Sequence, residues 1–328
     1  MAVRAYLYDA EGHDQEVQIT AELLAKVESR QLLWIDVNEH EPQPLQELAG
    51  LLELDAASLR NIASFDGSRV DNYGNYTQFA VVTAPATVVE NETPKHAHEQ
   101  SVLHFLIDAH WLLTVHHGEV SFVEEFRSKH RAETTIGELT THDFAASLLD
   151  VHLEAYFDEI GRIEAMVDKL DEQALINPSA KTLLARMVAL RRRVSRLRAA
   201  LAGQRNVFHA LSRPDLQPVT ESGATPHFQV LTARFERAID EVERTRDLIV
   251  GSFELFASRT AQQTNDLVKA LTYLTAVIGV CAAVAGVFGM NFETEFFGTG
   301  DAGFYATIIA LLAAVILATA VARWRGWI

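Results

Sequence analysis

The residues with the clearest chemical potential form a short polar phrase, Gly289-Met290-Asn291, between two apolar segments. Asn291 offers a neutral carboxamide oxygen, and a second carboxamide, Asn265, stands near the start of the first apolar segment. A ring of such groups can replace one face of the water shell of a hydrated cation without the charge of a carboxylate. Glycine lets the backbone turn at low steric cost where a helix must stop. The phrase therefore indicates a cation-binding turn at a helix end.

The two apolar segments that flank this phrase have the length and composition of membrane-spanning helices. Residues 267–288 contain a single charge, Lys269, and residues 304–322 contain none. A bilayer core of about 30 Å requires about 20 apolar residues in a helix, and uninterrupted runs of this kind are typical of helices in lipid. The alternative is a buried hairpin in a soluble protein, which two full-length runs close together in the sequence disfavour.

Two stripes of different character run along the first apolar segment. Small or moderate side chains spaced by fours and threes form one stripe, which consists of Thr264, Val268, Leu271, Thr275, Gly279, Ala282 and Gly286. Bulky side chains form the other, which consists of Tyr273, Val277, Val280, Val284 and Val287. The first stripe suits a pore lining or a close helix partner, and the second suits lipid or the other apolar segment. Small residues on a membrane helix more often indicate close packing, so both interpretations stay open.

A helical pattern without proline runs from His227 into the first apolar segment and predicts one continuous helix that ends at Phe288. At 1.5 Å per residue this helix would be about 90 Å long. A lone helix of this length is rarely stable, so the pattern implies a bundle or an oligomer.

The first 140 residues or so predict a mixed α/β domain with a small sheet. Stretches rich in Val, Leu and aromatic residues have the pattern of strands, at residues 2–10, 31–39, 75–90, 101–108 and 110–119. Leucines spaced by threes and fours predict one helix from Leu45 to Ile62.

From Thr141 onward the sequence predicts two long antiparallel helices with a turn at Asn177-Pro178. The first helix has an apolar stripe of Leu149, Leu153, Tyr156, Ile160, Ile163 and Val167. Its other face is acidic, with Glu154, Asp158, Glu159, Glu164, Asp168, Asp171 and Glu172. The second helix is basic, with Arg186, Arg191, Arg192, Arg193, Arg196 and Arg198. We expect the opposite charges to pair across the two helices, and contact of the basic run with anionic lipid headgroups is the alternative.

Charge and cysteine content exclude several classes of protein. The net charge of −16 disfavours nucleic acid as a partner, and the single cysteine, Cys281, allows no disulfide framework. The sequence contains no phosphate-binding glycine loop, no His-Glu-x-x-His motif and no nucleophile elbow. We therefore expect neither an enzyme nor a resident cofactor.

Positive charges predict the orientation of the two spans. The stretch between them has no Lys or Arg, whereas Arg323 and Arg325 follow the second span. Both ends of the chain are therefore expected in the cytoplasm, and the first residues lack the apolar core of a signal peptide. Trp324 and Trp327 suit the membrane interface, where they would contact lipid. We expect a multi-pass protein of the inner (plasma) membrane.

These features together resemble the CorA family of divalent-cation transporters over most of the chain. The resemblance rests on the two C-terminal spans, on Gly-Met-Asn at the end of the first, and on "NDLVKALT" at its entrance. The tail "RWRGWI" and the upstream stretches "LLWIDV", "VDNYGNYTQFAVV" and "WLLTVHH" are also similar to the family. Gly-Met-Asn is highly specific in this context and weak alone.

The resemblance implies a funnel-shaped homopentamer that passes Mg²⁺, and also Co²⁺ or Ni²⁺, through a pore. Asn291 would bind the hydrated cation at the outer mouth, with Gly289 and Met290 shaping the turn. Mg²⁺ dehydrates reluctantly, so a first contact through water suits this ion.

The resemblance also assigns the stripe of small side chains to the pore wall. Asn265 would lie at the inner end of the pore, and Val268 and Leu271 would form its hydrophobic constriction. Glu254, lower on the long helix, matches an acidic position of the family and would face the lumen of the funnel.

The implied organisation places a small mixed sheet with helices in the cytosol, followed by a stalk helix and two spans. Its parts are an α/β domain at 1–140, long antiparallel helices at 141–226, a stalk helix at 227–288 that includes the first span at about 267–288, an extracytoplasmic loop at 289–303, the second span at 304–323 and a cytosolic tail at 324–328.

The chain departs from the family pattern in the loop and on two helices. The loop continues "FETEFF" where many members have Met-Pro-Glu, although Glu293, Glu295 and Asp301 keep it acidic. Five copies of these carboxylates would attract cations, whereas each one alone is better explained as part of a polar loop. Val230 stands where the stalk often carries an aspartate of a regulatory metal site, and Gly279 replaces a bulky pore residue.

Two alternatives remain beside a magnesium transporter. A zinc transporter of the ZntB branch would use imidazole ligands, and the histidines that lie close in sequence are His96, His98, His104, His110, His116 and His117. Their spacing makes no convincing ligand set. The alternative from another class is a non-conducting membrane receptor or scaffold that senses ions.

Overall fold

The computed structural model describes residues 3–28, 30–38, 43–64, 69–84, 101–118, 120–129, 134–176, 181–290 and 300–326. The chain divides into two compact units. The first unit comprises Met1–Lys169 and Leu184–Val250, and the second comprises Leu170–Leu183 and Gly251–Ile328. Each unit is described by itself below.

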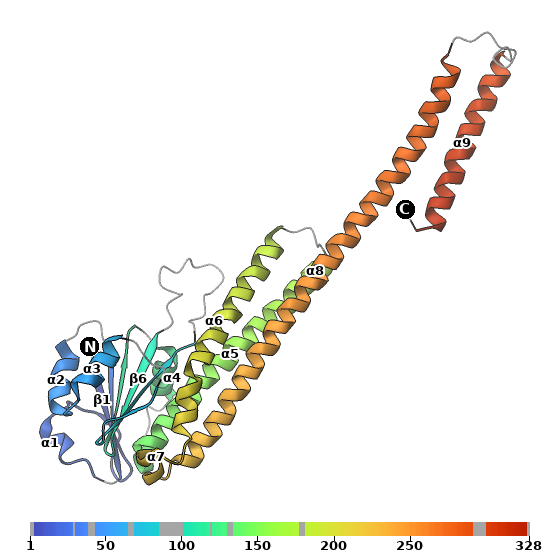
Figure 1. Cartoon of the computed structure of the whole chain (residues 1–328). Coiled ribbons are helices and arrows are strands. Elements are labelled where there is room, and N and C mark those ends of the chain that lie inside the picture. The colour runs from blue at the N-terminus through green and yellow to red at the C-terminus, as the bar shows by residue number, and fades with distance from the viewer. Residues whose placement is uncertain are drawn as a thin grey trace. The chain divides into compact units, whose positions relative to one another are not determined.

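A seven-stranded mixed sheet forms the centre of the first unit (Figure 1). Its strands lie in the order β2-β1-β3-β7-β6-β5-β4. They are β1 (Val3–Asp9), β2 (Gln15–Glu16), β3 (Gln31–Asn38), β4 (Asp71–Asn72), β5 (Thr77–Val82), β6 (Val102–Ile107) and β7 (Trp111–His116). All neighbours pair antiparallel except β3 and β7, which are parallel. The expected mixed sheet is confirmed, and the two-residue strands β2 and β4, which have no apolar pattern, make it larger than expected.

Helices cover both faces of the sheet because side chains alternate between the faces along each strand. On one face, Leu33 and Ile35 join a core with Leu45 and Leu48. These two leucines belong to α2 (Gln43–Leu51), which lies near α1 (Ala21–Leu24) and α3 (Ala56–Ser64) in the chain. On the other face, the Trp34 ring lies 6.0 Å from Phe126 and 5.5 Å from Phe144. These rings come from α4 (Ser121–Lys129) and α5 (Thr141–Ile176), and the turn η1 (Ile136–Glu138) connects the two helices.

The single helix predicted from Leu45 to Ile62 is wrong, because the structure has two helices there. The first ends at Leu51 and the second begins at Ala56. Glu53 between them has φ +50°, in the left-handed region that ends a right-handed helix. The leucine spacing continues through this turn and therefore does not reveal it.

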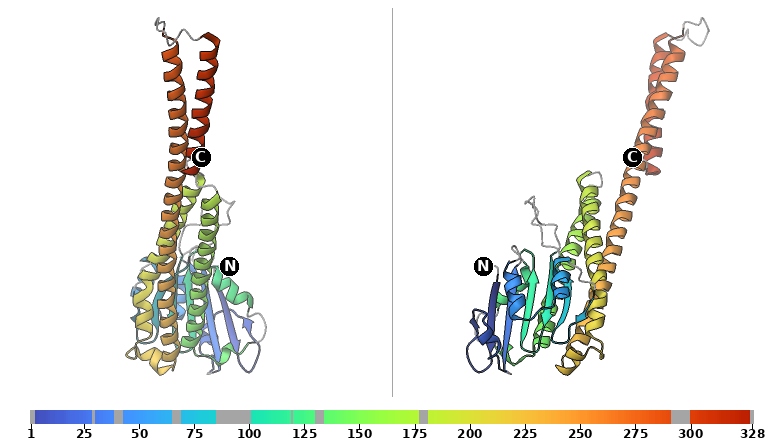
Figure 2. Two further views of the ribbon diagram at one scale, coloured as in Figure 1. Left: turned by 90° about the vertical axis from the view of Figure 1, so that its right-hand side faces the viewer. Right: turned by 60° about the vertical axis from the view of Figure 1, so that its left-hand side comes forward.

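Three long helices complete the first unit and pass into the second. They are α5, α6 (Lys181–Leu211) and α8 (Thr225–Phe288), with the short α7 (Gln217–Glu221) before α8. Within the first unit α5, α6 and α8 lie side by side (Figure 2), and the stacked rings of Phe208 and Phe235 lie 4.3 Å apart between α6 and α8. The predicted apolar stripe of α5 is buried throughout, at Leu149, Leu153, Tyr156, Ile160, Ile163 and Val167.

The expected pairing of an acidic α5 with a basic α6 holds at one position among the described residues. Glu159 is buried rather than on an exposed acidic face, and it pairs with Arg193 of α6 and, at 3.4 Å, with Arg162. Other pairs between long helices involve α8. Arg234 of α8 binds the α5 acids Asp150 and Glu154, and Arg198 and Arg205 of α6 bind Glu243 and Glu236. The expectation left out α8 as a partner. The predicted turn at Asn177-Pro178 lies outside the described residues.

The second unit contains the C-terminal part of α8 and the helix α9 (Gly300–Trp324). The whole of α8 is one helix of 64 residues, which is about 96 Å at 1.5 Å per residue. The predicted long helix is thereby confirmed. Both α8 and α9 contain windows long and apolar enough to span a membrane, and none of either window is buried within the structure.

Candidate functional site: a surface of α8 and its C-terminal end

One side of α8 packs against α9 in the second unit. The half-buried residues of α8 recur at helical spacing and are Lys269, Tyr273, Val277, Cys281 and Val284. The half-buried residues of α9 recur in the same way and include Gly303, Thr307, Leu311, Val315 and Thr319. Residues three or four apart share one side of a helix, so each helix contributes one stripe to this contact. Most of the predicted bulky stripe therefore faces the other span.

A hydrogen bond fixes the register of the two spans. The Tyr273 hydroxyl lies 2.5 Å from Oγ1 of Thr319. The Thr319 hydroxyl donates to the carbonyl of Val315 at 2.7 Å, so the Tyr273 hydroxyl is the donor in the bond between the spans. The bulky pattern in the sequence suggested a contact here, but nothing in it revealed the Tyr–Thr pair.

The predicted pore stripe lies on the opposite side of α8 from Tyr273. At 3.6 residues per turn, Thr275 and Ala282 are about half a turn away from Tyr273 and Val284. All the predicted pore-lining residues are exposed, namely Thr264, Asn265, Val268, Leu271, Thr275, Gly279, Ala282 and Gly286. Val268 is 54% and Leu271 62% exposed. The structure therefore leaves the stripe from Thr264 to Gly286 on one free surface that α9 does not cover, with Asn265 at an edge of this surface.

The polar groups at the start of this surface are bound to their own helix or to one another. The Thr264 hydroxyl donates to the carbonyl of Thr260 at 2.9 Å, so its oxygen lone pairs remain available as acceptors. Lys269 binds Asp266 at 2.9 Å. The single cation of the first apolar segment is thus neutralised by a neighbour, and it lies on the α9 side rather than on the candidate pore surface.

The backbone at the end of α8 leaves little room beside Gly289. The amide of Gly289 donates to the Ala285 carbonyl at 2.9 Å, and the amide of Met290 donates to the Val287 carbonyl at 3.3 Å. A Cβ atom on Gly289 would lie 3.2 Å from the Ala285 oxygen. Gly289 is not among the glycines with positive φ. Its glycine character therefore serves close approach of the backbone rather than a left-handed turn.

Part of the predicted mouth lies outside the described residues. This holds for Asn291, Glu293 and Glu295. Asp301 is described and lies exposed in the first turn of α9, directly after Gly300 with φ +59°. The N-terminal end of a helix carries partial positive charge, which gives this carboxylate a local stabilising role.

Glu254 lies exposed on α8, near the candidate pore surface. It precedes Asn265 by eleven residues, which is about three helical turns, so both side chains emerge on the same side of the helix. The structure therefore places this acid below the inner end of the candidate pore surface, on the same side of α8.

The histidines of the zinc alternative do not form a common site within the described residues. His110 and His117 are exposed, whereas His104 and His116 are buried in the sheet. Burial, together with the nearby His117, lowers the pKa of His104 to about 4. Across the described part of the chain, no three His, Cys, Asp or Glu side chains gather as a metal site would require. His96 and His98 lie outside that part.

His116 belongs to a buried polar network between β3, β7 and α4. Burial pulls its pKa down, but the hydrogen bond and charge of Asp36 outweigh this effect and raise the pKa above its usual value. Asp36 also accepts from Thr114 Oγ1 at 2.6 Å and lies 3.7 Å from Arg127. A histidine held in this way is a structural group of the sheet.

Comparison with known proteins gives consistent results along the chain. The CorA cobalt/magnesium transport protein of Thermotoga maritima is 31% identical over 147 residues, which are 45% of this chain and 41% of that protein. The complete CorA magnesium transporter of Methanocaldococcus jannaschii matches with a TM-score of 0.76 at 18% identity, over 100% of this chain and 99% of that one. The ZntB cytoplasmic domain of Vibrio parahaemolyticus matches with a TM-score of 0.58 at 11% identity, over 80% of this chain and 100% of that domain.

At these identities the two solved structures establish the fold and do not distinguish one cation from another. The family evidence covers far more of the sequence than the Thermotoga match does. A family model described as CorA-like Mg²⁺ transporter protein matches residues 29–324, from the start of β3 to the end of α9. That description names a transporter, in agreement with the expectation that the chain is not an enzyme. The chain is a member of the CorA-like Mg²⁺ transporter family.

Proposed function

We propose that this protein is a divalent-cation channel or transporter, with Mg²⁺ as its first substrate and Co²⁺ and Ni²⁺ as further ones. The observation that carries the proposal is the free surface of α8. One side of the apolar part of α8 contacts α9. The other side carries small and hydroxyl side chains that remain exposed. Copies of this surface facing one another would enclose a narrow path across the membrane.

The oligomer in this proposal is a homopentamer with α8 at its centre. A helix of 64 residues is about 96 Å long, roughly three times the hydrocarbon core. The exposed side chains of Val268 and Leu271 form an apolar patch on the candidate pore surface. Such a patch suits a constriction that closes by excluding water. The five copies of α9 would then face lipid.

Selection of the cation is assigned to the end of α8. The tight backbone at Gly289 would hold Met290 and Asn291 where five α8 ends converge. Five carboxamide oxygens could hold a hydrated Mg²⁺ through its water shell. The acidic residues Glu293, Glu295 and Asp301 would raise the local cation concentration above this ring.

Regulation through the stalk is expected to differ from that of family members with an aspartate at the position of Val230. Val230 is 69% exposed on α8 and has no group that binds a cation. We expect Mg²⁺ on the side of the first unit to inhibit flux weakly. Glu254 is the acidic residue that would face the lumen instead.

Flux from reconstituted vesicles tests the proposed cation path. Wild-type protein is expected to pass Mg²⁺, Co²⁺ and Ni²⁺, and Asn291→Ala is expected to lower selective flux at least tenfold because the water-shell ligand is lost. Asn265→Ala is the matched control, since it removes the same group at the inner end and should have the smaller effect. Wild-type flux in Asn291→Ala would contradict the assigned mouth.

The same experiment separates the two alternatives. Flux of Zn²⁺ without Mg²⁺, and its dependence on pH, would favour a ZntB-like transporter, whose cytoplasmic domain shares the fold. No divalent flux from a purified, correctly assembled oligomer would favour a non-conducting receptor or scaffold. For localisation, we propose the inner (plasma) membrane with both termini in the cytoplasm, because Arg323 and Arg325 follow the second span.

A further inference from the structure

A groove between α8 and α9 has the properties of a lipid site, and we propose that it binds one acyl chain of an anionic phospholipid whose phosphate contacts Arg325. This site is separate from the candidate pore surface, which lies on the other side of α8. It would exist whichever cation the protein carries.

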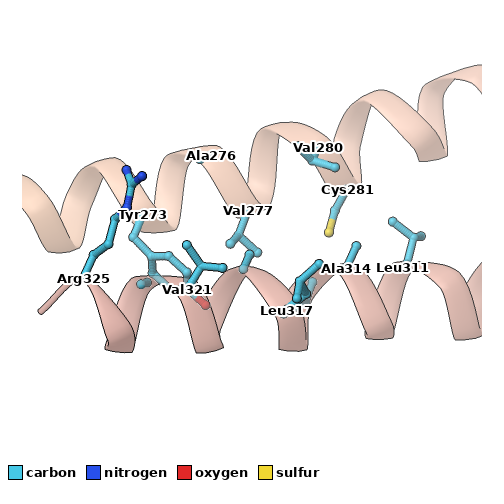
Figure 3. Close-up of a pocket in the computed structure, with 13 residues that line it drawn as sticks. Tyr273, Ala276, Val277, Val280, Cys281, Leu311, Ala314, Leu317, Val321 and Arg325 are labelled. Atoms are coloured by element: carbon cyan, nitrogen blue, oxygen red, sulfur yellow. The ribbon is translucent and has the colours of Figure 1, made fainter. Parts of the chain in front are cut away.

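The groove is apolar along its length. Its part next to Arg325 has a volume of about 450 Å³, with Tyr273 and Cys281 from α8 and Leu311 and Ala314 from α9 in its walls (Figure 3). A further hollow of about 530 Å³ continues it past Ala314 toward Phe288. From Arg325 to Leu311 the groove follows fourteen residues of α9, or about 21 Å. That length exceeds one leaflet of a hydrocarbon core of about 30 Å, so an extended acyl chain fits.

The groove has a cation at one end. Arg325 lines that end, and its side chain makes no ion pair or hydrogen bond with any residue that the structure describes. Its neighbour Trp324 is 85% exposed, and tryptophan at the end of a span prefers the level of the lipid headgroups. An unpaired guanidinium at that level matches a phosphate, which it can bind with two parallel hydrogen bonds. Basic pockets between membrane helices bind anionic headgroups in this way.

A second copy of the chain explains the groove less well than a lipid does. The register set by Tyr273 and Thr319 places Arg325 near the level of Asp266 on α8. In each copy, Asp266 is already bound to Lys269 at 2.9 Å. The described part of the spans beyond that level, residues 270–290 and 300–322, contains one further charge, Asp301, at the opposite end of α9. A phosphate therefore supplies the anion that the spans lack.

Two arginines on either side of Trp324 provide a matched test. Arg323→Gln and Arg325→Gln remove the same charge from positions two residues apart at the end of α9, but only Arg325 lines the groove. Full-length protein is titrated with phosphatidylglycerol and with phosphatidylcholine of identical acyl chains, and bound lipid is counted by native mass spectrometry. Arg325→Gln should weaken phosphatidylglycerol binding about fivefold, the effect of about one basic residue near a charged lipid surface. Arg323→Gln should bind like the wild type. Equal loss in both variants, or in neither, would overturn the proposal.

A second pair of variants tests the acyl part of the site. Ala314→Phe fills the groove, whereas Ala313→Phe places the same ring on an exposed part of α9 outside it. Ala314→Phe should reduce binding of both lipids while the oligomer keeps its size, and neither inorganic phosphate nor dihexanoyl phosphatidylglycerol should compete with the long-chain lipid. Lipid binding that survives Ala314→Phe would overturn the proposal, because the lipid would then bind elsewhere. An oligomer that dissociates with no change in lipid count would overturn it in favour of a neighbouring copy in the groove.

Discussion

His152 shows how a single buried residue makes the first unit sensitive to acid. Gln204 donates through Nε2 to the Val82 carbonyl, so its Oε1 accepts from Nε2 of His152 at 3.1 Å. Nδ1 of His152 is then the acceptor nitrogen, and it has no hydrogen-bond partner among the residues that the structure describes. Burial therefore opposes protonation and lowers the pKa of His152 to about 4.

The sign of the resulting pH dependence follows from this lowered pKa. Between about pH 6.5 and pH 4 the unfolded chain binds the proton and the folded chain does not, so stability falls as the pH falls. From pH 7 to pH 5 this group should cost about 2 kcal/mol of unfolding free energy. His152→Gln should remove that part of the pH dependence in urea unfolding of the full chain in detergent. Exposed His110→Gln is the control, and identical pH slopes in His152→Gln and wild type would contradict the assignment.

At the scale of elements, Tyr273 and Thr319 define the pairing of α8 with α9. Tyr273→Phe removes the hydrogen bond and keeps the ring, so the loss should be about 0.6 kcal/mol and no more than about 1.7 kcal/mol. The unfolding temperature in detergent should fall by a few degrees at most. Tyr305→Phe, on an exposed ring of α9, should leave it unchanged. A larger effect from Tyr305 would mean that this register bond is not what holds the two spans.

The elements that could be predicted from the sequence are those whose pattern reports their packing. The apolar β3 run "QLLWIDVN" forms a buried strand, and the apolar stripe of α5 is buried as its helical spacing predicts. The break between α2 and α3 could not be predicted in this way, because the positive φ at Glu53 falls on a residue with no turn preference. The two-residue strands β2 and β4 escaped detection because their residues are exposed or polar.

In the candidate site, too, the features visible in the helical spacing could be predicted, and those that depend on packing between helices could not. The helical spacing of Thr264, Leu271 and Thr275 predicted one stripe, and all three are exposed on one side of α8. The role of Arg325 in the groove could not be predicted, because it depends on the register of α9 against α8. From the sequence, the position of Arg325 shows only that a positive charge follows the second span.

The whole-molecule proposal, a pore built from copies of α8, depends on which side of this helix faces the central axis. Leu271 and Leu274 provide a direct test because they are the same residue type, less than one turn apart, with 62% and 52% of their surface exposed. Leu271 lies on the candidate pore surface, and Leu274 lies on a flank of the helix. Leu271→Asn places a polar ring in a constriction that closes by excluding water. We therefore expect Mg²⁺ flux from vesicles to rise severalfold.

Leu274→Asn introduces the same polar group on the flank of α8 and should leave the Mg²⁺ flux near the wild-type value. Size-exclusion chromatography of both variants separates a change in the pore from a change in assembly, since an asparagine at a subunit contact would alter the oligomer first. If Leu274→Asn raised the flux and Leu271→Asn did not, α8 would have to be rotated about its axis, and the exposed stripe from Thr264 to Gly286 would belong to a contact between subunits. The packing of Tyr273 and Val284 against α9 limits that rotation, because the side of α8 that binds α9 cannot also face the pore.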